Sequence, residues 1–119
     1  MNYKNKQLEI KRIKNLFINN YPEGCIKWSN ESLEHFLVKC QVCYYLKRNN
    51  WEVWTESYLR SFKRRVDIWA IHKSGMAIIV EISSSETRNS ILLKEESTPE
   101  GIDFIKVNAK DFNYSKFKL

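Results

Sequence analysis

The sequence predicts an α/β domain in which a central mixed β-sheet is flanked by helices. Two patterns carry this prediction: apolar residues recur at helical spacing through the first part of the chain, and short segments rich in Val, Ile and Trp follow between turn residues. The chain has 119 residues, of which 43% are hydrophobic and only three are glycine, which fits one globular domain over 1–119. The predicted elements, in order, are helices over 3–20 and 29–48, strands over 51–58, 66–71 and 76–83, a helix over 84–96 and a strand over 104–107.

Each of the first two helices has a recognisable end. A turn-forming Asn-Asn-Tyr-Pro-Glu-Gly segment closes the helix over 3–20. Ser29 or Asn30 can cap the second helix at its start, and a basic Lys47-Arg48 pair followed by two asparagines marks its end. The residues that we expect this second helix to bury, because they recur at helical spacing, are Leu33, Phe36, Leu37, Cys40, Cys43 and Tyr44.

The three strands that follow are expected to form the centre of the sheet. The first shows the period-two alternation of a strand, and the second and third are apolar on both faces, as central strands are. A short polar His-Lys-Ser-Gly loop joins the second strand to the third and predicts a β-hairpin. The later helix is expected to carry Ile91, Leu92 and Leu93, and a Thr-Pro-Glu-Gly turn separates it from the last strand.

The charge of the chain favours an anionic partner. Twenty Lys and Arg against fourteen Asp and Glu give a formal net charge of +6, and a basic surface attracts nucleic acid, anionic membrane or acidic protein. The clustering of the cations is more informative than their number, because four fall within six positions and several others lie on the first helix. The four clustered residues, which we take as candidate DNA-phosphate ligands, are Arg60, Lys63, Arg64 and Arg65.

The sequence predicts neither a membrane segment nor a secretory signal. The longest apolar run, over 76–80, is far too short to span a bilayer. Residues 1–12 mix Lys with Asn and Gln, where a signal would have an apolar core. We therefore expect an intracellular, cytoplasmic protein with no membrane partner.

The three cysteines form an odd number, which does not suggest a disulfide framework. Cys40 and Cys43 form a single CxxC, so that a zinc site would have to recruit Cys25 and His35 as its other ligands. Two thiols three residues apart on a helix fit better as small core side chains. We expect the cysteines to be structural.

The predicted hairpin brings two acids together. If three residues form its loop, Trp69 faces Ile79 and Asp67 faces Glu81. Side chains directly opposite each other approach to about 5 Å at Cβ, whereas a slip of one residue would put the acids on opposite faces. Two carboxylates inside a sheet repel each other and resist desolvation, so they need a proton, a cation or a metal. Oxygen-only ligands suit Mg²⁺ or Mn²⁺.

A purely structural role is the alternative for these two acids. Asp67 could pair with Arg64 or Arg65, and Glu81 could simply end a strand, since structural ion pairs use the same residue types. The structural role is the less favoured of the two, because both acids belong to a pattern that extends over one helix and two strands.

That pattern resembles the PD-(D/E)XK nuclease superfamily, which has the restriction-endonuclease-like fold, and in size and layout it is similar to archaeal Holliday-junction resolvases. It consists of Glu34 on a helix, Arg65-Val66-Asp67-Ile68 on one strand and Ile79-Val80-Glu81-Ile82-Ser83 on the next. The resemblance implies an α-β-β-β-α-β core over 29–107, to which the helix over 3–20 is an addition.

The resemblance also implies roles for these residues. Asp67 and Glu81 would bind Mg²⁺ or Mn²⁺, and the backbone carbonyl of Ile82 would be a further metal ligand. The helical acid of the family, which often reaches the metal through water, falls on Glu34. Glu31 is the alternative if the helix is rotated.

One position departs from the family pattern. The family has a Lys two residues after the third-strand acid, where it orients or polarises the attacking water, and this chain has Ser83 there. Lys94, on the following helix, is the best substitute that the sequence offers, and Lys39 is the second.

The expected function is metal-dependent endonucleolytic hydrolysis of DNA phosphodiester bonds, with branched or junction DNA among the candidate substrates. The rival expectation is a catalytically degenerate nuclease fold that binds DNA without cutting it, and Ser83 is its best support. An unrelated small α/β protein is the third. Because cleavage of two strands needs two sites, the resemblance also suggests a homodimer.

Overall fold

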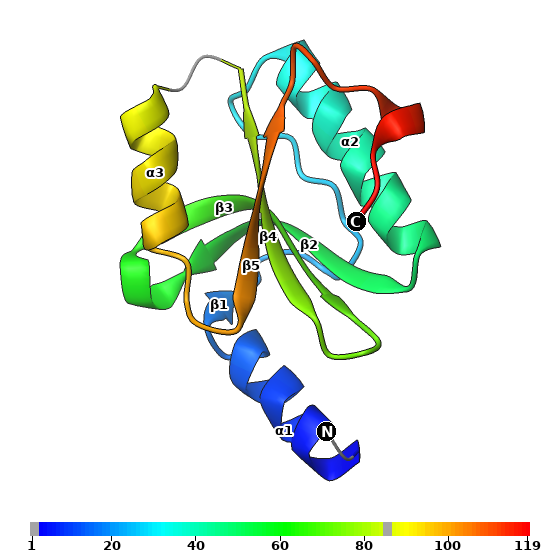
Figure 1. Ribbon diagram of the computed structural model, residues 1–119, viewed down its shortest axis with the longest axis vertical. Helices are drawn as coiled ribbons and strands as arrows, with labels where there is room; N and C mark the ends of the chain where they lie inside the picture. The colour runs from blue at the N-terminus through cyan, green and yellow to red at the C-terminus, as the bar shows by residue number, and fades with distance from the viewer. Residues whose placement is uncertain (1–2, 85–86) are drawn as a thin grey trace.

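The computed structural model describes residues 3–84 and 87–119 (Figure 1). Its helices are α1 (Tyr3–Lys14), α2 (Leu33–Arg48) and α3 (Arg88–Glu96), with 3₁₀ turns η1 (Arg60–Phe62) and η2 (Tyr114–Lys116). Its strands are β1 (Phe17–Ile18), β2 (Trp51–Leu59), β3 (Arg64–His72), β4 (Ala77–Ser83) and β5 (Ile102–Asn108). This is the predicted mixed α/β architecture, and it is compatible with a restriction-endonuclease-like core.

The strands form one sheet of order β1-β2-β3-β4-β5. Neighbouring strands are antiparallel except for the parallel pair of β4 and β5, which the crossover through α3 connects. Apolar side chains cover both faces of the central strands, and α2 and α3 lie on opposite sides of the sheet in Figure 1. Two cores result, one between the sheet and α2 and the other beneath the end of α1.

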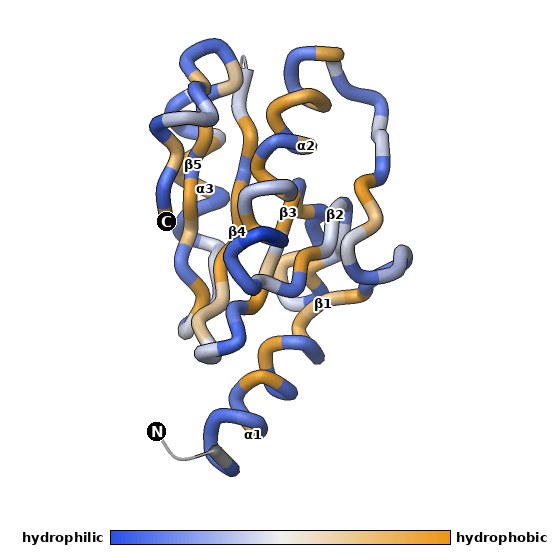
Figure 2. The backbone as a smooth tube through the Cα atoms, turned by 90° about the vertical axis from the view of Figure 1, so that its right-hand side faces the viewer, coloured by the Kyte–Doolittle hydropathy of each residue, from blue (hydrophilic) through white to orange (hydrophobic). Residues whose placement is uncertain are grey.

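α1 extends from the sheet as a projecting arm. Figure 2 shows it leading away from the strands, with polar and apolar residues alternating along it. Ile13, in the last turn of α1, is buried in the second of the two cores, the one beneath the end of this helix. In the part of the chain that the structure describes, neither α1 nor another helix is long and apolar enough to cross a membrane.

The register of the central hairpin is the one predicted. Trp69 pairs with Ile79, and the paired region continues to Ile68 and Val80. One residue further on, Asp67 and Glu81 lie on the same face of the sheet. Beyond the last backbone pair the Asp67 side chain links the two strands, because its Oδ2 accepts a hydrogen bond of 2.8 Å from the Ile82 N–H.

The first helix is shorter than predicted. α1 ends at Lys14 rather than at residue 20, so the prediction of a helix over 3–20 is wrong at its C-terminal end. Phe17 and Ile18 instead pair with Leu59 and Tyr58 of β2 as the short strand β1. The Phe17 ring gains a stacked contact with the Trp69 ring, with centroids 4.1 Å apart, and this burial outweighs the local helical preference. The helix predicted over 84–96 is observed from Arg88, and residues 85 and 86 of that prediction lie outside the described residues.

The second helix is capped and rotated differently from the prediction. Ser32, rather than Ser29 or Asn30, caps α2, because its hydroxyl accepts from the His35 N–H. The buried residues of α2 are Val38, Lys39, Val42, Cys43 and Leu46. Of the predicted stripe, Leu33, Leu37 and Tyr44 are exposed, at 71%, 51% and 54%. The helix therefore turns a different face to the sheet, one that includes a lysine.

β2 has an unusual backbone at Glu56. This residue has φ +53°, in the left-handed region, yet it is buried and lies inside the strand between the pairs Thr55–Ile68 and Ser57–Val66. A non-glycine residue in this region costs about 1 kcal/mol or more, so the surrounding structure must hold it there. Its position in the register is opposite Asp67.

Candidate active site

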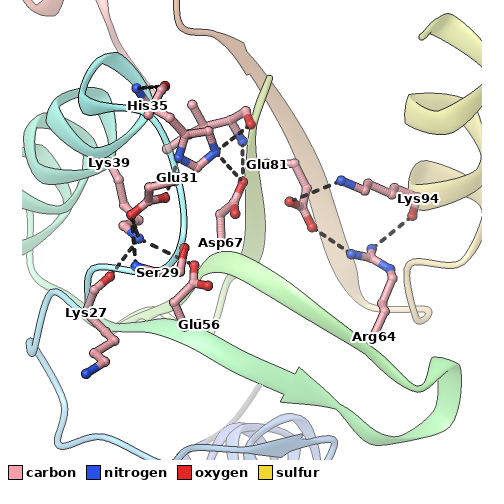
Figure 3. Close-up of polar contacts among 12 residues, drawn as sticks. Lys27, Ser29, Glu31, His35, Lys39, Glu56, Arg64, Asp67, Glu81 and Lys94 are labelled. Atoms are coloured by element: carbon pink, nitrogen blue, oxygen red, sulfur yellow. Dashed lines mark hydrogen bonds and ion pairs between the residues drawn. The ribbon is translucent and has the colours of Figure 1, made fainter. Parts of the chain in front are cut away.

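The acids meet where β3 and β4 stop pairing and the first turn of α2 approaches the sheet. Figure 3 shows Asp67 and Glu81 there, with His35 approaching Asp67 from one side and Arg64 and Lys94 pointing at Glu81 from the other. Each acid therefore has its own cationic neighbour.

Asp67 is held in its ionised form. Burial raises the pKa of this carboxyl, but hydrogen bonds from His35 and from the Ile82 N–H more than offset that effect, and the net pKa is lowered. The Nε2 atom of His35 lies 3.4 Å from Oδ2 of Asp67. Asp67 is thus an acceptor with a fixed orientation.

Glu81 is in the opposite state. Its side chain is only 2% exposed, and burial together with the neighbouring Asp67 charge raises its pKa to about 8. This rise persists although Arg64 Nη1 donates to Oε1 at 2.6 Å and Lys94 Nζ lies 3.9 Å from Oε2. The acid pair therefore shares a proton near neutral pH.

His35 connects the acid pair to α2. Its Nε2 contacts the Ile82 carbonyl oxygen at 2.9 Å, and its Nδ1 lies 2.5 Å from Oε2 of Glu31. The hydrogen bond with Asp67, opposed by burial and supported by the Asp67 and Glu31 charges, raises the pKa of His35 to about 9. The ring is therefore an imidazolium between two carboxylates at neutral pH.

Lys39 forms the next contact of the same network. Its ammonium is fully buried and donates to the Lys27 carbonyl at 2.7 Å and to Oε1 of Glu31 at 2.6 Å. It also lies 3.5 Å from Oε2 of Glu56, the residue with the left-handed backbone. Charges thus alternate in sign from β2 through α2 to β3. The residues of this network, in order, are Glu56, Lys39, Glu31, His35 and Asp67.

The comparison with known proteins supports a nuclease-like identity for this region. A family model described as the nuclease-like domain of competence protein CoiA matches residues 31–98, which is more than half of the chain. The chain belongs to this family. No curated protein and no solved structure matches it.

The segment matched by the CoiA nuclease-like family contains the whole charged network. It begins at Glu31 and extends past Lys94, whereas α1, β1 and β5 lie outside it. The residues that converge in space therefore come from the part of the chain that defines the family.

The structure brings together most of the residues predicted for the site. Asp67, Glu81 and the Ile82 carbonyl are adjacent, and Lys94 reaches Glu81. Glu34 is exposed on α2, and Glu31, the alternative for a rotated helix, contacts His35 instead. Ser83 lies further along β4 and lines a cavity of 590 Å³ between β4, β5 and α3.

The basic cluster is divided by the structure. Arg64 turns inward, where it donates to Glu81, to the Ser97 hydroxyl at 3.2 Å and to the Lys94 carbonyl at 3.2 Å. The Glu81 carboxyl therefore holds this guanidinium toward the acid pair, and the role of Arg64 as a DNA-phosphate ligand stays a prediction. Arg60, Lys63 and Arg65 remain exposed.

Sequence reasoning missed His35 and Glu56 as parts of this site. The sequence indicates His35 only as a candidate zinc ligand and places Glu56 only within a predicted strand. One signal was present, because Glu31, His35 and Lys39 recur every four residues and would share one face of the predicted helix. For Glu56 the sequence contains no signal, since its partner Lys39 is distant along the chain.

The oxygen donors at the acid pair are of the type that a hard divalent cation takes. Asp67, Glu81 and the Ile82 carbonyl offer oxygen only, and burial, together with the neighbouring Asp67 charge, raises the pKa of Glu81. Among the described residues no group of three or more His, Cys, Asp or Glu is arranged as a metal cage, which also applies to the cysteines considered for zinc. Mg²⁺ does not need such a cage, because it keeps several waters and uses one or two carboxylates plus substrate phosphates.

Proposed function

We propose that this CoiA nuclease-like domain is a metal-dependent endonuclease of the PD-(D/E)XK type that hydrolyses DNA phosphodiester bonds. The observation that carries the proposal is the pairing of the partly exposed Asp67 with the buried Glu81 at the point where β3 and β4 part, inside a nuclease-like family segment.

The side chains divide the work of hydrolysis. Asp67, Glu81 and the Ile82 carbonyl would hold Mg²⁺ or Mn²⁺, which supplies an acidified water and offsets charge on the phosphoryl oxygens. Arg64 fixes the Glu81 carboxylate through its hydrogen bond of 2.6 Å. The Ile82 N–H and His35 fix the Asp67 carboxylate from the other side.

We propose that Lys94 takes the place of the lysine of the PD-(D/E)XK pattern, where this chain has Ser83. Its ammonium lies 3.9 Å from Glu81, and its side chain is 28% exposed, so it can face both the acid pair and an incoming phosphate. Lys39, the second choice, is fully buried against Glu31 and the Lys27 carbonyl. A cation beside the reacting phosphate stabilises the charge that develops in the transition state.

The substrate is expected to bind by its phosphates. Arg60 and Lys63 in the turn between β2 and β3, with Arg65 at the start of β3, give this region an exposed positive charge, which supplies affinity with little sequence information. A cut through both strands needs two active sites, so we propose a homodimer for that reaction.

The proposal is tested by a cleavage assay on linear, branched and single-stranded DNA with Mg²⁺, with Mn²⁺ and with chelator. We expect metal-dependent cleavage that Asp67→Asn and Glu81→Gln each lower by about a hundred-fold or more. Asp103→Asn, on the exposed part of β5, is the matched control and should cut like the parent chain. Cleavage that survives both Asp67→Asn and Glu81→Gln would place the reaction elsewhere.

A second candidate function is DNA binding without cleavage. It is favoured by Ser83 at the position of the family lysine and by the cations that already contact both acids. If no DNA form is cut with either metal while salt-dependent binding persists, this function replaces the first.

A further inference from the structure

The ring of His35 occupies the gap that opens between β3 and β4. The paired register ends at Ile68 and Val80, and Nε2 of the ring meets the Ile82 carbonyl at 2.9 Å and Oδ2 of Asp67 at 3.4 Å. The side chain is 14% exposed, so it fills this gap from the side of α2 (Figure 3). The ring thus contacts one atom of each of two groups that the proposed reaction uses.

Glu31 contacts the His35 ring on the side opposite to Asp67 and fixes its orientation. Nδ1 lies 2.5 Å from Oε2 of Glu31 in an ion pair that does not have hydrogen-bond geometry, and Nε2 faces the Ile82 carbonyl. Glu31 is itself held through its other oxygen by the buried ammonium of Lys39 at 2.6 Å. A histidine whose ring nitrogens are both engaged cannot flip without breaking two contacts, so its geometry is transmitted to its partners.

Asp67 depends on this ring for its direction. Its Oδ2 accepts from the Ile82 N–H at 2.8 Å, and His35 approaches the same oxygen. The ring and Ile82 therefore form a closed set of contacts, in which His35 contacts the carbonyl of Ile82 while the amide of Ile82 holds Asp67. Loss of the ring would leave the Asp67 carboxylate held by the Ile82 N–H alone and the Ile82 carbonyl without its contact on the β3 side.

We propose that His35, oriented by Glu31, is a positioning residue that holds the Asp67 carboxylate and the Ile82 carbonyl in the arrangement needed for phosphodiester cleavage. This role rests on the proposed nuclease function. His35 does not take part in bond making or breaking. It acts through Asp67, and its contribution is the fixed direction of two oxygen donors.

The first test compares the cleavage kinetics of three variants with those of the parent chain. His35→Leu removes both ring donors, His35→Gln keeps a donor that can reach the Ile82 carbonyl, and His72→Gln changes the other histidine of the chain as control. We expect His35→Leu to lower kcat by about ten-fold or more and to leave KM within about two-fold, because the loss belongs to the transition state. His35→Gln should recover part of kcat, and His72→Gln should match the parent.

The second test does not depend on cleavage. The amide proton of Ile82 reports the contact with Asp67, and the amide of Ile78, earlier on β4, serves as reference. In NMR spectra we expect His35→Leu to shift the Ile82 signal and to speed its hydrogen exchange relative to Ile78, and His35→Gln to change both less. If His35→Leu does not fold, Glu31→Gln, which weakens the hold on the ring, should move the Ile82 amide in the same direction.

The two tests separate the inference from the proposed function. A parent chain that never cuts DNA, with an Ile82 amide that responds to His35, overturns the nuclease proposal and leaves the positioning of Asp67 standing. A parent chain that cuts, with an Ile82 amide unmoved by both His35→Leu and Glu31→Gln, overturns the positioning role. Equal losses of kcat in His35→Gln and His35→Leu overturn it as well.

Discussion

Two lysines of this chain have the same charge and opposite surroundings. Lys39 is fully buried, and its ammonium contacts Glu31, Glu56 and the Lys27 carbonyl. Lys94 is partly exposed and lies 3.9 Å from Glu81. A buried ammonium surrounded by acceptors stabilises its neighbours but cannot approach a phosphate. At the scale of single residues, therefore, only Lys94 can serve the chemistry of the acid pair directly.

Lys94→Ala should lower DNA cleavage by about a hundred-fold while DNA affinity changes little, because the lost interaction belongs to the transition state. Single-turnover rates and binding isotherms measure the two effects. Ser83→Lys, which restores the family pattern, should recover part of the rate in the Lys94→Ala background. Lys110→Ala, an exposed lysine after β5, is the matched control. Unchanged cleavage by Lys94→Ala would show that Lys94 does not replace the family lysine.

At the scale of elements, α2 decides which residues enter the site. It has apolar residues on two faces, and the sheet covers the one that contains Val38, Val42 and Leu46. That choice brings Glu31, His35 and Lys39 toward the sheet. Periodicity alone selected the other face, because it counts Lys39 as a polar residue that must be exposed. The buried acids that compensate Lys39 come from elsewhere in the fold, so no local pattern reveals them.

The buried face of α2 can be tested by stability. Val42→Ala removes two methyl groups from a fully buried site and should destabilise the fold by about 2 kcal/mol. Leu37→Ala, on the exposed face of the same helix, should change stability by less than about 0.5 kcal/mol. Urea unfolding measures both. If Leu37→Ala costs more than Val42→Ala, the helix is rotated the other way.

The turn between β2 and β3 is the element that we expect to meet DNA. Replacing Arg60 and Arg65 together by Ala should weaken binding similarly for all sequences and reduce the slope of log affinity against log salt by about 2. Fluorescence anisotropy at several salt concentrations measures this slope. Lys116 and Lys118, near the C-terminus, supply the control pair. A slope unaffected by the Arg60 and Arg65 changes would move the DNA surface to another basic element, with α1 next.

At the scale of the whole molecule, the register of the sheet determines which acids meet at the site, and much of the sheet could be predicted. Alternation and turn chemistry predicted β2 to β5 and the pairing of Trp69 with Ile79, from which the meeting of Asp67 and Glu81 follows. The end of α1 and strand β1 could not be predicted, because Phe17 leaves the helix for contacts with Trp69, distant in sequence. What local sequence determines was predictable, and what two distant segments decide together was not.

The stability of the whole fold should depend on pH through the charged network. His35 has its pKa raised from 6.5 to about 9, so its stabilising contribution is complete below pH 6.5 and is lost as pH rises to about 9. Glu81 has its pKa raised from 4.5 to about 8, so its protonated form favours the fold below pH 4.5 and this effect is lost by about pH 8. The two losses overlap between pH 6.5 and 8.

Thermal unfolding in chelator should therefore show a Tm that falls as pH rises from 6.5 to 9. His35→Gln should remove the part of the fall above pH 8, where Glu81 is already ionised. Mg²⁺ should raise Tm more at pH 8 than at pH 6.5, because fewer protons then compete with it for the acid pair. A Tm that stays constant or rises across this range would contradict the assigned charge states.

The left-handed backbone at Glu56 has a consequence for how this family can diverge. Glycine adopts such a conformation at no steric cost, so a chain that had lost its activity would gain stability from Glu56→Gly once Lys39 is also replaced. The carboxylate of Glu56 is retained, in this view, only while Lys39 needs it. Once one of the two is lost the other becomes a burden, and selection should remove it. Among related sequences we therefore expect Glu56 and Lys39 to be kept together in active lineages and replaced together in degenerate ones.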